Sequence, residues 1–187
     1  MEFSAIIDAV YQLPEQSKMK LIRSVREVEV PKGWSLLKAG TVETRIYFIK
    51  KGIVRAYSST PDNEVTFWFG KEGQAVISMR SYVEQLPGYE DIESLEACEL
   101  YELNTEHLHR LFEEDIYIAN WGRKFAEQEL IRTEERLIQR QFRTASERYT
   151  DLLIHHPDLV QRIQLGHIAS YLGITQVSLS RIRAELK

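Results

Sequence analysis

The sequence predicts an α+β protein in which a roll of short strands is followed by helices. From Val28 to Leu103, apolar and polar residues alternate, and glycines or proline-containing turns recur at short intervals. This pattern is typical of short antiparallel strands in a sandwich or barrel-like roll. On both sides of this segment the apolar residues have helical spacing. The chain then ends with IASYLGITQVSLSRIRAEL, which indicates two short helices joined at a glycine.

The composition is that of an ordinary globular protein. The chain has 187 residues, of which 43% are apolar and 28% charged, enough for one large domain or two small ones. No run of 18 apolar residues occurs, and the N-terminus carries acids where a signal peptide would be basic. We therefore expect a cytoplasmic protein that does not enter a membrane. The single Cys98 excludes internal disulfides and any multi-cysteine metal or iron–sulfur site.

Helices are predicted on both sides of the roll. Apolar residues recur at helical spacing within residues 2–12 and 15–25, and Pro14 separates the two stretches. A third helix should begin after Asn104, whose short side chain can accept a hydrogen bond from a free backbone N–H.

A long helix is predicted next, because only Gly122 disfavours one between Asp115 and Ile154. A helix of this length usually has a partner, and one of its faces carries large apolar residues at i, i+3 and i+7. We interpret this face as a dimer interface made of Ile118, Trp121, Gly122 and Phe125. The alternative, that it packs on the roll of its own chain, stays open.

The terminal stretch has the residues that a helix-turn-helix requires. Ala169 is the small residue of the first helix, Gly173 permits the turn, and Thr175 can cap the second helix. The second helix has no acid before Glu185, whereas an ordinary solvated face mixes both charge signs. Its glutamine and arginine suit adenine and guanine edges. The candidate DNA-binding residues are Thr175, Gln176, Val177, Ser178 and Arg181.

The charge distribution agrees with this interpretation. Residues 1–122 carry 13 basic against 20 acidic side chains, a balance of −7, whereas residues 123–187 carry 11 against 8, a balance of +3. An acidic first part and a basic second part indicate two modules, of which only the second suits a polyanion.

These motifs together resemble the cyclic-AMP-receptor/Fnr (Crp/Fnr) family of bacterial transcription regulators. The resemblance rests on KGWSLLKAG, IYFIKKGIVRAY, the long helix and HIASYLGITQVSLSRIR, in this order. It implies a cyclic-nucleotide-binding-like β-roll (a double-stranded β-helix) in residues 1–114, a dimerisation helix in 115–142 and a helix-turn-helix domain in 143–187. It also implies a homodimer on palindromic double-stranded DNA, with a recognition helix at about 175–186 in the major groove and RNA polymerase as a further partner.

The roll departs from the pattern of family members that bind cyclic nucleotides. These use a Gly-Glu pair and, about ten residues later, an Arg-Ser or Arg-Thr pair that neutralises the phosphate. Aligned back from Cys98, these positions fall near Ser78 and at Gly88-Tyr89, followed by Glu90 and Asp91. Two acids disfavour an anion, so cyclic AMP is not the expected ligand. An Arg80-Ser81 pair occurs about eight residues early.

An unidentified small molecule stays a candidate effector of the roll. The residues that would line its pocket, or else simply form core, are Phe69, Val76, Ile77, Ser78, Met79, Arg80 and Tyr89. No cofactor and no metal are expected, since the histidine pairs are spaced for solvent and not for ligation.

Two further expectations concern function. No nucleophile–base pair or phosphate-cradling loop is evident, so we expect no enzyme. The alternative to a DNA-binding regulator is a sensing module whose terminal helices make protein contacts. Because the sequence stops at Lys187, we expect no β-hairpin wing, with Arg148 or Arg162 supplying nearby phosphate contacts.

Overall fold

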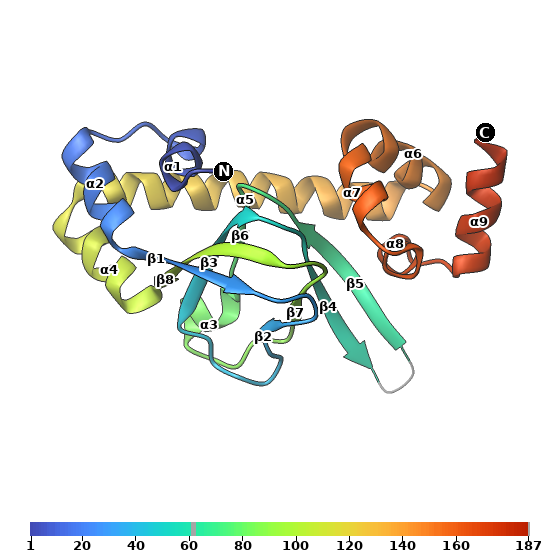
Figure 1. Cartoon of the computed structure of the whole chain (residues 1–187), viewed down its shortest axis with the longest axis horizontal. Helices are drawn as coiled ribbons and strands as arrows, with labels where there is room; N and C mark the ends of the chain where they lie inside the picture. The colour runs from blue at the N-terminus through green and yellow to red at the C-terminus, as the bar shows by residue number, and fades with distance from the viewer. Residues whose placement is uncertain (61–62, 187) are drawn as a thin grey trace.

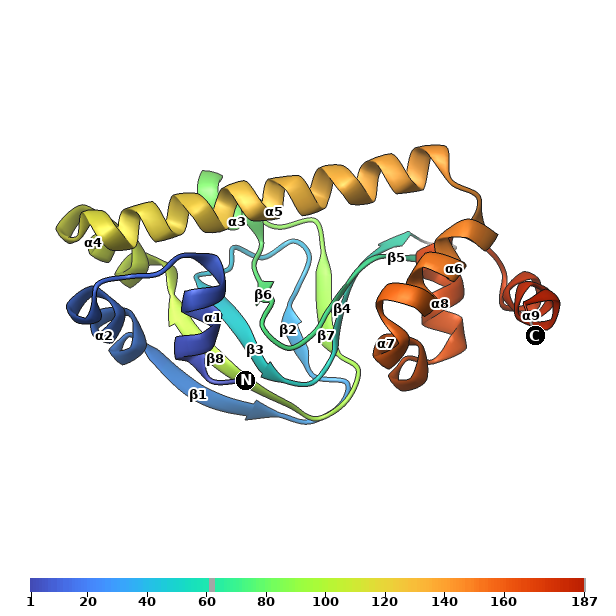
Figure 2. The same cartoon turned by 90° about the horizontal axis from the view of Figure 1, so that it is seen from above.

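The computed structural model describes residues 1–60 and 63–186 and confirms the α+β fold class. A long helix, α5 (Ile116–Phe142), runs the length of the molecule. The strands and the N-terminal helices lie along its first half, and a group of short helices lies at its far end (Figures 1 and 2). No helix in the described part of the chain is long and apolar enough to cross a membrane.

The roll consists of two four-stranded antiparallel sheets, as the alternation of residues predicts. One sheet has the order β1-β8-β3-β6 and the other β2-β7-β4-β5. Between them lies an apolar cluster that includes Ile49, Val54 and Leu100, each fully buried. The strands are β1 (Val25–Val30), β2 (Ser35–Leu37), β3 (Arg45–Lys51), β4 (Val54–Thr60), β5 (Asn63–Gly70), β6 (Ala75–Val76), β7 (Asp91–Ser94) and β8 (Cys98–Asn104). A short helix, α3 (Met79–Glu84), which the sequence did not predict, joins β6 to β7.

Three helices close one end of the roll. The first two, α1 (Phe3–Val10) and α2 (Glu15–Arg23), lie where helical spacing predicts them, with Pro14 as the N-cap of α2. The third, α4 (Thr105–Glu114), begins as expected at Asn104, whose side chain accepts a hydrogen bond from the N–H of His107 at 3.0 Å. These helices pack on the first turns of α5 in one apolar cluster.

Helix α5 ends earlier than the sequence pattern indicates. The helix-forming residues continue to Ile154, but the chain turns at Arg143 and a new helix, α6 (Ala145–His155), begins. Thr144 stops the longer helix because it forms a capping box with Glu147: the Thr144 N–H donates to the Glu147 carboxylate at 2.8 Å, and the Thr144 hydroxyl accepts from the Glu147 N–H.

The face of α5 that we interpreted as a dimer interface packs inside its own chain. Ile118 and Trp121 are 0% and 1% exposed, and Trp121 Nε1 donates to the carbonyl of Ile7 at 3.1 Å. The ring of Phe125 stacks on that of Trp121. A methyl group added at Gly122 would overlap the ring of Phe112 of α4. Ile118 and Trp121 are therefore not available to a second copy, because the N-terminal core of their own chain covers them, whereas Gly122 and Phe125 are partly exposed.

The opposite side of α5 is apolar and uncovered further along the helix. At 3.6 residues per turn, Leu130 and Leu137 lie roughly opposite Trp121, and Ile131 and Ile138 lie about a quarter-turn to one side. Leu130 and Leu137 are 71% and 63% exposed, and Ile131 and Ile138 repeat with the same seven-residue spacing. We call Leu130, Ile131, Leu137, Ile138 and Phe142 the apolar stripe of α5.

Candidate nucleic-acid interface

The last four helices form a small domain, which we call the reader, beyond the end of α5. They are α6, α7 (Pro157–Arg162), α8 (Leu165–Leu172) and α9 (Gln176–Glu185). Ile168, Leu172 and Leu179 are fully buried and hold α8 against α9. These apolar residues therefore form part of the core of the reader.

The turn between α8 and α9 has the geometry that the sequence predicts. Gly173 adopts a left-handed conformation with φ of 67°, which glycine accepts without a steric penalty. The N–H of Gly173 donates to the carbonyl of Ser170, and the N–H of Ile174 donates to the carbonyl of Ala169, both at 3.0 Å. These two bonds cap the C-terminal end of α8. Thr175 caps α9 by accepting from the N–H of Ser178 at 3.1 Å. Helices α8 and α9 are therefore joined by a tight turn at Gly173.

Helix α9 lies at the end of the molecule farthest from the roll (Figures 1 and 2), and we call three exposed side chains of its first turns, Gln176, Val177 and Arg181, its leading face. Gln176 and Arg181 are exposed, and Val177 is 64% exposed. Thr175 and Ser178 are already paired within the helix, because their hydroxyls form a hydrogen bond with each other at 3.0 Å. The structure thus gathers all five predicted residues on the first turns of one helix, with a free arginine among them.

The two arginines expected to contact phosphates nearby are both engaged within the protein. Arg148 donates through Nη2 to the carbonyl of Leu172 at 2.7 Å. Arg162 forms ion pairs with Glu72 and Glu96 of the roll. Neither guanidinium is free for DNA in this arrangement. The sequence could not show this because the partners of Arg162 are 90 and 66 residues away.

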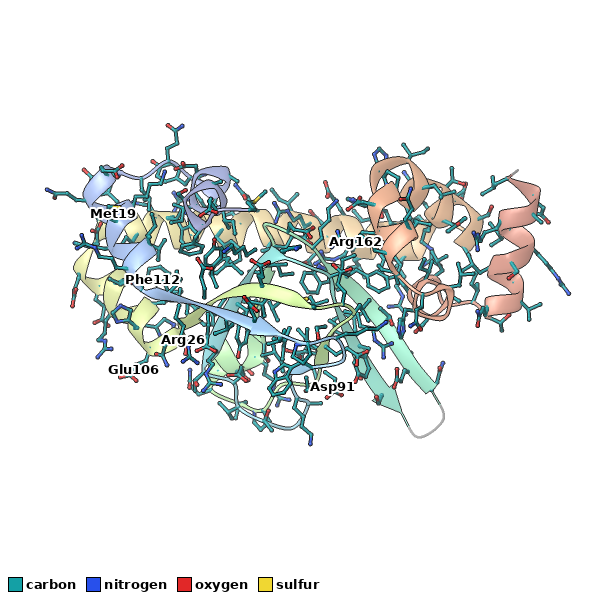
Figure 3. All side chains as sticks on the ribbon, viewed as in Figure 1. Met19, Arg26, Asp91, Glu106, Phe112 and Arg162 are labelled. Atoms are coloured by element: carbon teal, nitrogen blue, oxygen red, sulfur yellow. The ribbon has the colours of Figure 1, made fainter. Side chains whose placement is uncertain are left out.

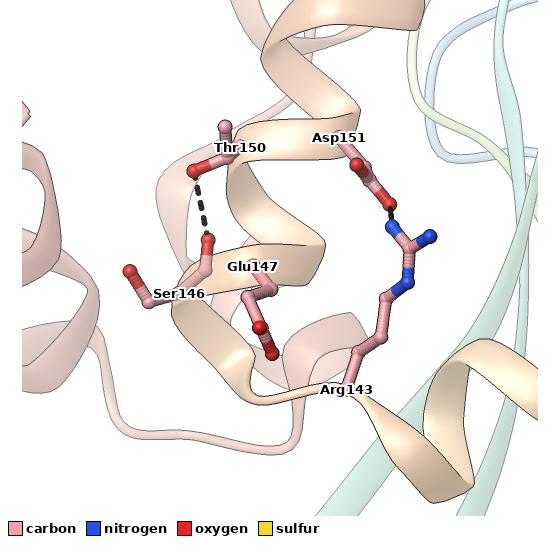
Figure 4. Close-up of a pocket in the computed structure, with 5 residues that line it drawn as sticks. All are labelled: Arg143, Ser146, Glu147, Thr150 and Asp151. Atoms are coloured by element: carbon pink, nitrogen blue, oxygen red, sulfur yellow. Dashed lines mark hydrogen bonds and ion pairs between the residues drawn. The ribbon is translucent and has the colours of Figure 1, made fainter.

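Two hollows lie beside the reader. One, of about 230 Å³, is lined by Arg143, Ser146, Glu147, Thr150 and Asp151 (Figure 4). Its polar groups are largely paired already: Arg143 with Asp151, and the Thr150 hydroxyl with the carbonyl of Ser146. The other, of about 160 Å³, lies where the reader meets the roll and is lined by Lys32, Gly33, Glu93, Ser94, Leu95, Arg162, Gln164 and His167. Within residues 1–60 and 63–186, no cluster of side chains could hold a metal ion.

Residues 27–115 match the family of cyclic nucleotide-binding domains. Among solved structures, FixK2 from Bradyrhizobium japonicum has a TM-score of 0.75 at 18% identity, covering 87% of this chain and 84% of that one. The c-di-GMP-responsive global regulator CLP of Xanthomonas campestris has a TM-score of 0.69 at 16% identity, covering 92% and 91%.

The catabolite activator protein of Thermus thermophilus is also similar, with a TM-score of 0.59 at 18% identity, covering 94% of this chain and 84% of that chain. No curated protein sequence matches. The roll, the long helix and the terminal helices thus share the fold of these solved structures, which confirms the fold that the resemblance of the sequence motifs implies.

The residues that the sequence relates to phosphate binding lie in α3 and in the segment before β7. Arg80 lies on the surface of α3 and pairs with Glu84 at 3.7 Å. The Ser81 hydroxyl donates to the carbonyl of Leu86 at 3.0 Å. Glu90, in contrast, is 6% exposed, and a methyl group added at Gly88 would lie 3.4 Å from its carboxylate. A buried carboxylate therefore lies next to Gly88 and Tyr89, the positions at which the family pattern would place the phosphate-binding pair.

The seven residues of the candidate effector pocket lie in different parts of the roll. Val76 is buried between the sheets, and Ile77 packs on the other apolar cluster. Met79 and Tyr89 are 51% and 63% exposed. Phe69 faces the reader, where its ring lies 5.2 Å from that of Tyr171. Arg80 is on the surface as described above, and Ser78 is buried with an unpaired hydroxyl.

Proposed function

We propose that this chain is a homodimeric, DNA-binding transcriptional regulator of the Crp/Fnr type and not an enzyme. The observation that carries the proposal is the uncovered, acid-free leading face of α9, presented by a helix-turn-helix at the end of the molecule. Such a helix enters the major groove with its N-terminal side chains toward the base edges. Gln176, Val177 and Arg181 would contact bases, and RNA polymerase is the expected downstream partner.

The apolar stripe of α5 supports the homodimer. Its residues 130 and 137, and 131 and 138, are seven apart, the repeat of two helices that pack along a common seam. A second copy of α5 is the occupant that this spacing fits. Two readers would then project from the same end of a paired helix, as a palindromic site requires.

The proposal includes no cyclic nucleotide. The buried Glu90 and the outward-facing Arg80 both disfavour a bound cyclic phosphate. Millimolar cyclic AMP is therefore expected to leave the melting temperature unchanged. A shift of several degrees would contradict this part of the proposal, because a ligand that binds only the folded state stabilises it.

Binding to genomic DNA fragments over a range of salt concentrations tests the proposed function. Affinity should fall steeply with salt because phosphate contacts release counterions. Arg181→Ala should cost roughly 1–3 kcal/mol and relax specificity at one base position. Arg110→Ala is the matched control, since it removes one exposed arginine from α4, at the opposite end of the molecule. A dimer without measurable affinity at low salt would instead favour a sensing module whose terminal helices contact proteins.

A further inference from the structure

The reader shares its apolar core with the roll. Ile53, just before β4, is 0% exposed and Phe69 of β5 is 7% exposed. Both belong to the cluster that contains Tyr149, Leu152, Leu159, Ile163, Ile168, Leu172 and Leu179. Ser170 of α8 adds two hydrogen bonds to β5: its hydroxyl donates to the carbonyl of Glu64 at 2.8 Å and accepts from the N–H of Thr66 at 2.9 Å. The β4–β5 ribbon thus completes the reader core.

Ion pairs at the end of α7 fix the same contact. Arg162 reaches from the reader to Glu72, at 2.9 Å, and to Glu96, and it lies between the two parts of the molecule (Figure 3). Glu72 is itself held in place, because its carboxylate accepts from the N–H of Gly52 at 2.9 Å. Burial alone would raise the pKa of Glu72, but its bonds to Arg162 and Gly52 outweigh burial and lower the pKa to about 2.

The covalent link to α5 does not orient the reader by itself. Only Arg143 and Thr144 separate the end of α5 from the start of α6, and two residues leave several backbone torsions free. The contact with the roll supplies the missing restraint. It also leaves the leading face of α9 exposed, so the docked arrangement is compatible with bound DNA.

We propose that Arg162 is a positioning residue for DNA recognition, which docks the reader on Glu72 and Glu96 so that α9 points away from the roll. The inference rests on the proposed function. In a dimer, two recognition helices must meet half-sites about one helical turn apart. If each reader were free to rotate, the dimer would lose the extra affinity that comes from binding both half-sites at once.

The test changes the roll side of the contact and leaves the reader untouched. Glu72→Gln with Glu96→Gln removes both carboxylates that Arg162 contacts. The matched control is Glu27→Gln with Glu99→Gln, which removes two carboxylates that share Lys50 within the roll and makes the same change in net charge. The probes are a palindromic duplex selected from random DNA by the unaltered protein, and a duplex carrying one of its half-sites.

Docking predicts that the first pair of substitutions lowers the ratio of palindrome to half-site affinity roughly tenfold, the effect expected of losing a charge-assisted, doubly bonded contact. The control pair should leave the ratio unchanged. Circular dichroism and gel filtration show whether each variant is folded and dimeric. Equal ratios in the unaltered protein and the first variant would overturn the inference alone. An unaltered protein that selects no DNA at low salt would overturn the proposed function, and the inference with it.

Reversing the charges separates docking from a direct phosphate contact by Arg162. Arg162→Glu should lower the ratio, and adding Glu72→Lys and Glu96→Lys should restore it. A phosphate contact predicts instead that affinity for both duplexes falls and that the roll substitutions do not restore it. That outcome would overturn the positioning role.

Discussion

Replacing Leu130 and Leu137 with alanine should dissociate the proposed dimer and leave the protomer folded. Both side chains lie on the apolar stripe of α5, where they are 71% and 63% exposed in the single chain. Alanine preserves the helix, because it has the highest helix propensity of all residues. The two substitutions therefore remove apolar surface from the proposed seam and little from the protomer core.

The size of the effect follows from the surface available for burial. A leucine-to-alanine change removes three carbon atoms, worth about 2.4 kcal/mol when fully buried at about 0.8 kcal/mol per methylene. Since about two thirds of each leucine is exposed, the seam can bury at most about 1.5 kcal/mol per residue. Four leucines per dimer give an upper value of about 6 kcal/mol, and burying half of their surface gives about 3 kcal/mol. The dimer Kd should rise by roughly two to four powers of ten.

Sedimentation velocity over a wide dilution series measures this Kd. Ile154→Ala is the control, because Ile154 is 65% exposed on α6, outside the stripe. Circular dichroism and urea unfolding at a concentration where the variant is monomeric should show that the protomer keeps its helices. A double variant with the dimer Kd of the unaltered protein would refute the assignment of this face to a second copy.

Three further predictions concern the contacts inside one chain. Ile53→Ala should lower the free energy of unfolding by about 2–4 kcal/mol in urea titrations, because it empties a fully buried site shared by roll and reader; a loss below about 1 kcal/mol would show that the site can collapse. Gly122→Ala should cost about 1–3 kcal/mol in the same assay, since the new methyl group overlaps the ring of Phe112, and an unchanged midpoint would contradict that close contact. Because the pKa of Glu72 is lowered to about 2, its contribution to stability should be complete above the ordinary value near 4.5 and decline as the pH falls toward 2. Comparing the acid unfolding of the unaltered protein with that of Glu72→Gln measures this contribution, and parallel curves would argue against the ion pair with Arg162.

Local patterns in the sequence anticipated most of the elements. Alternation predicted the strands because each strand of the roll buries one face. Gly173 and Thr175 predicted the turn between α8 and α9, because each fixes the backbone through contacts with residues close to it in the sequence. The capping box at Thr144 was also present in the sequence. The end of α5 at this capping box is hard to predict, because helix-forming residues continue on both sides of Thr144.

The sequence by itself determined the fold class and the leading face of α9, since both depend on neighbours close along the chain. Only the tertiary structure decided which side of α5 is covered. That helix carries apolar residues on opposite sides, and periodicity cannot show which of them the aromatic residues of the N-terminal core will cover. Tertiary structure likewise decided the role of Arg162, because its charge is set by sequence but its carboxylate partners are brought to it by the folding of two distant loops.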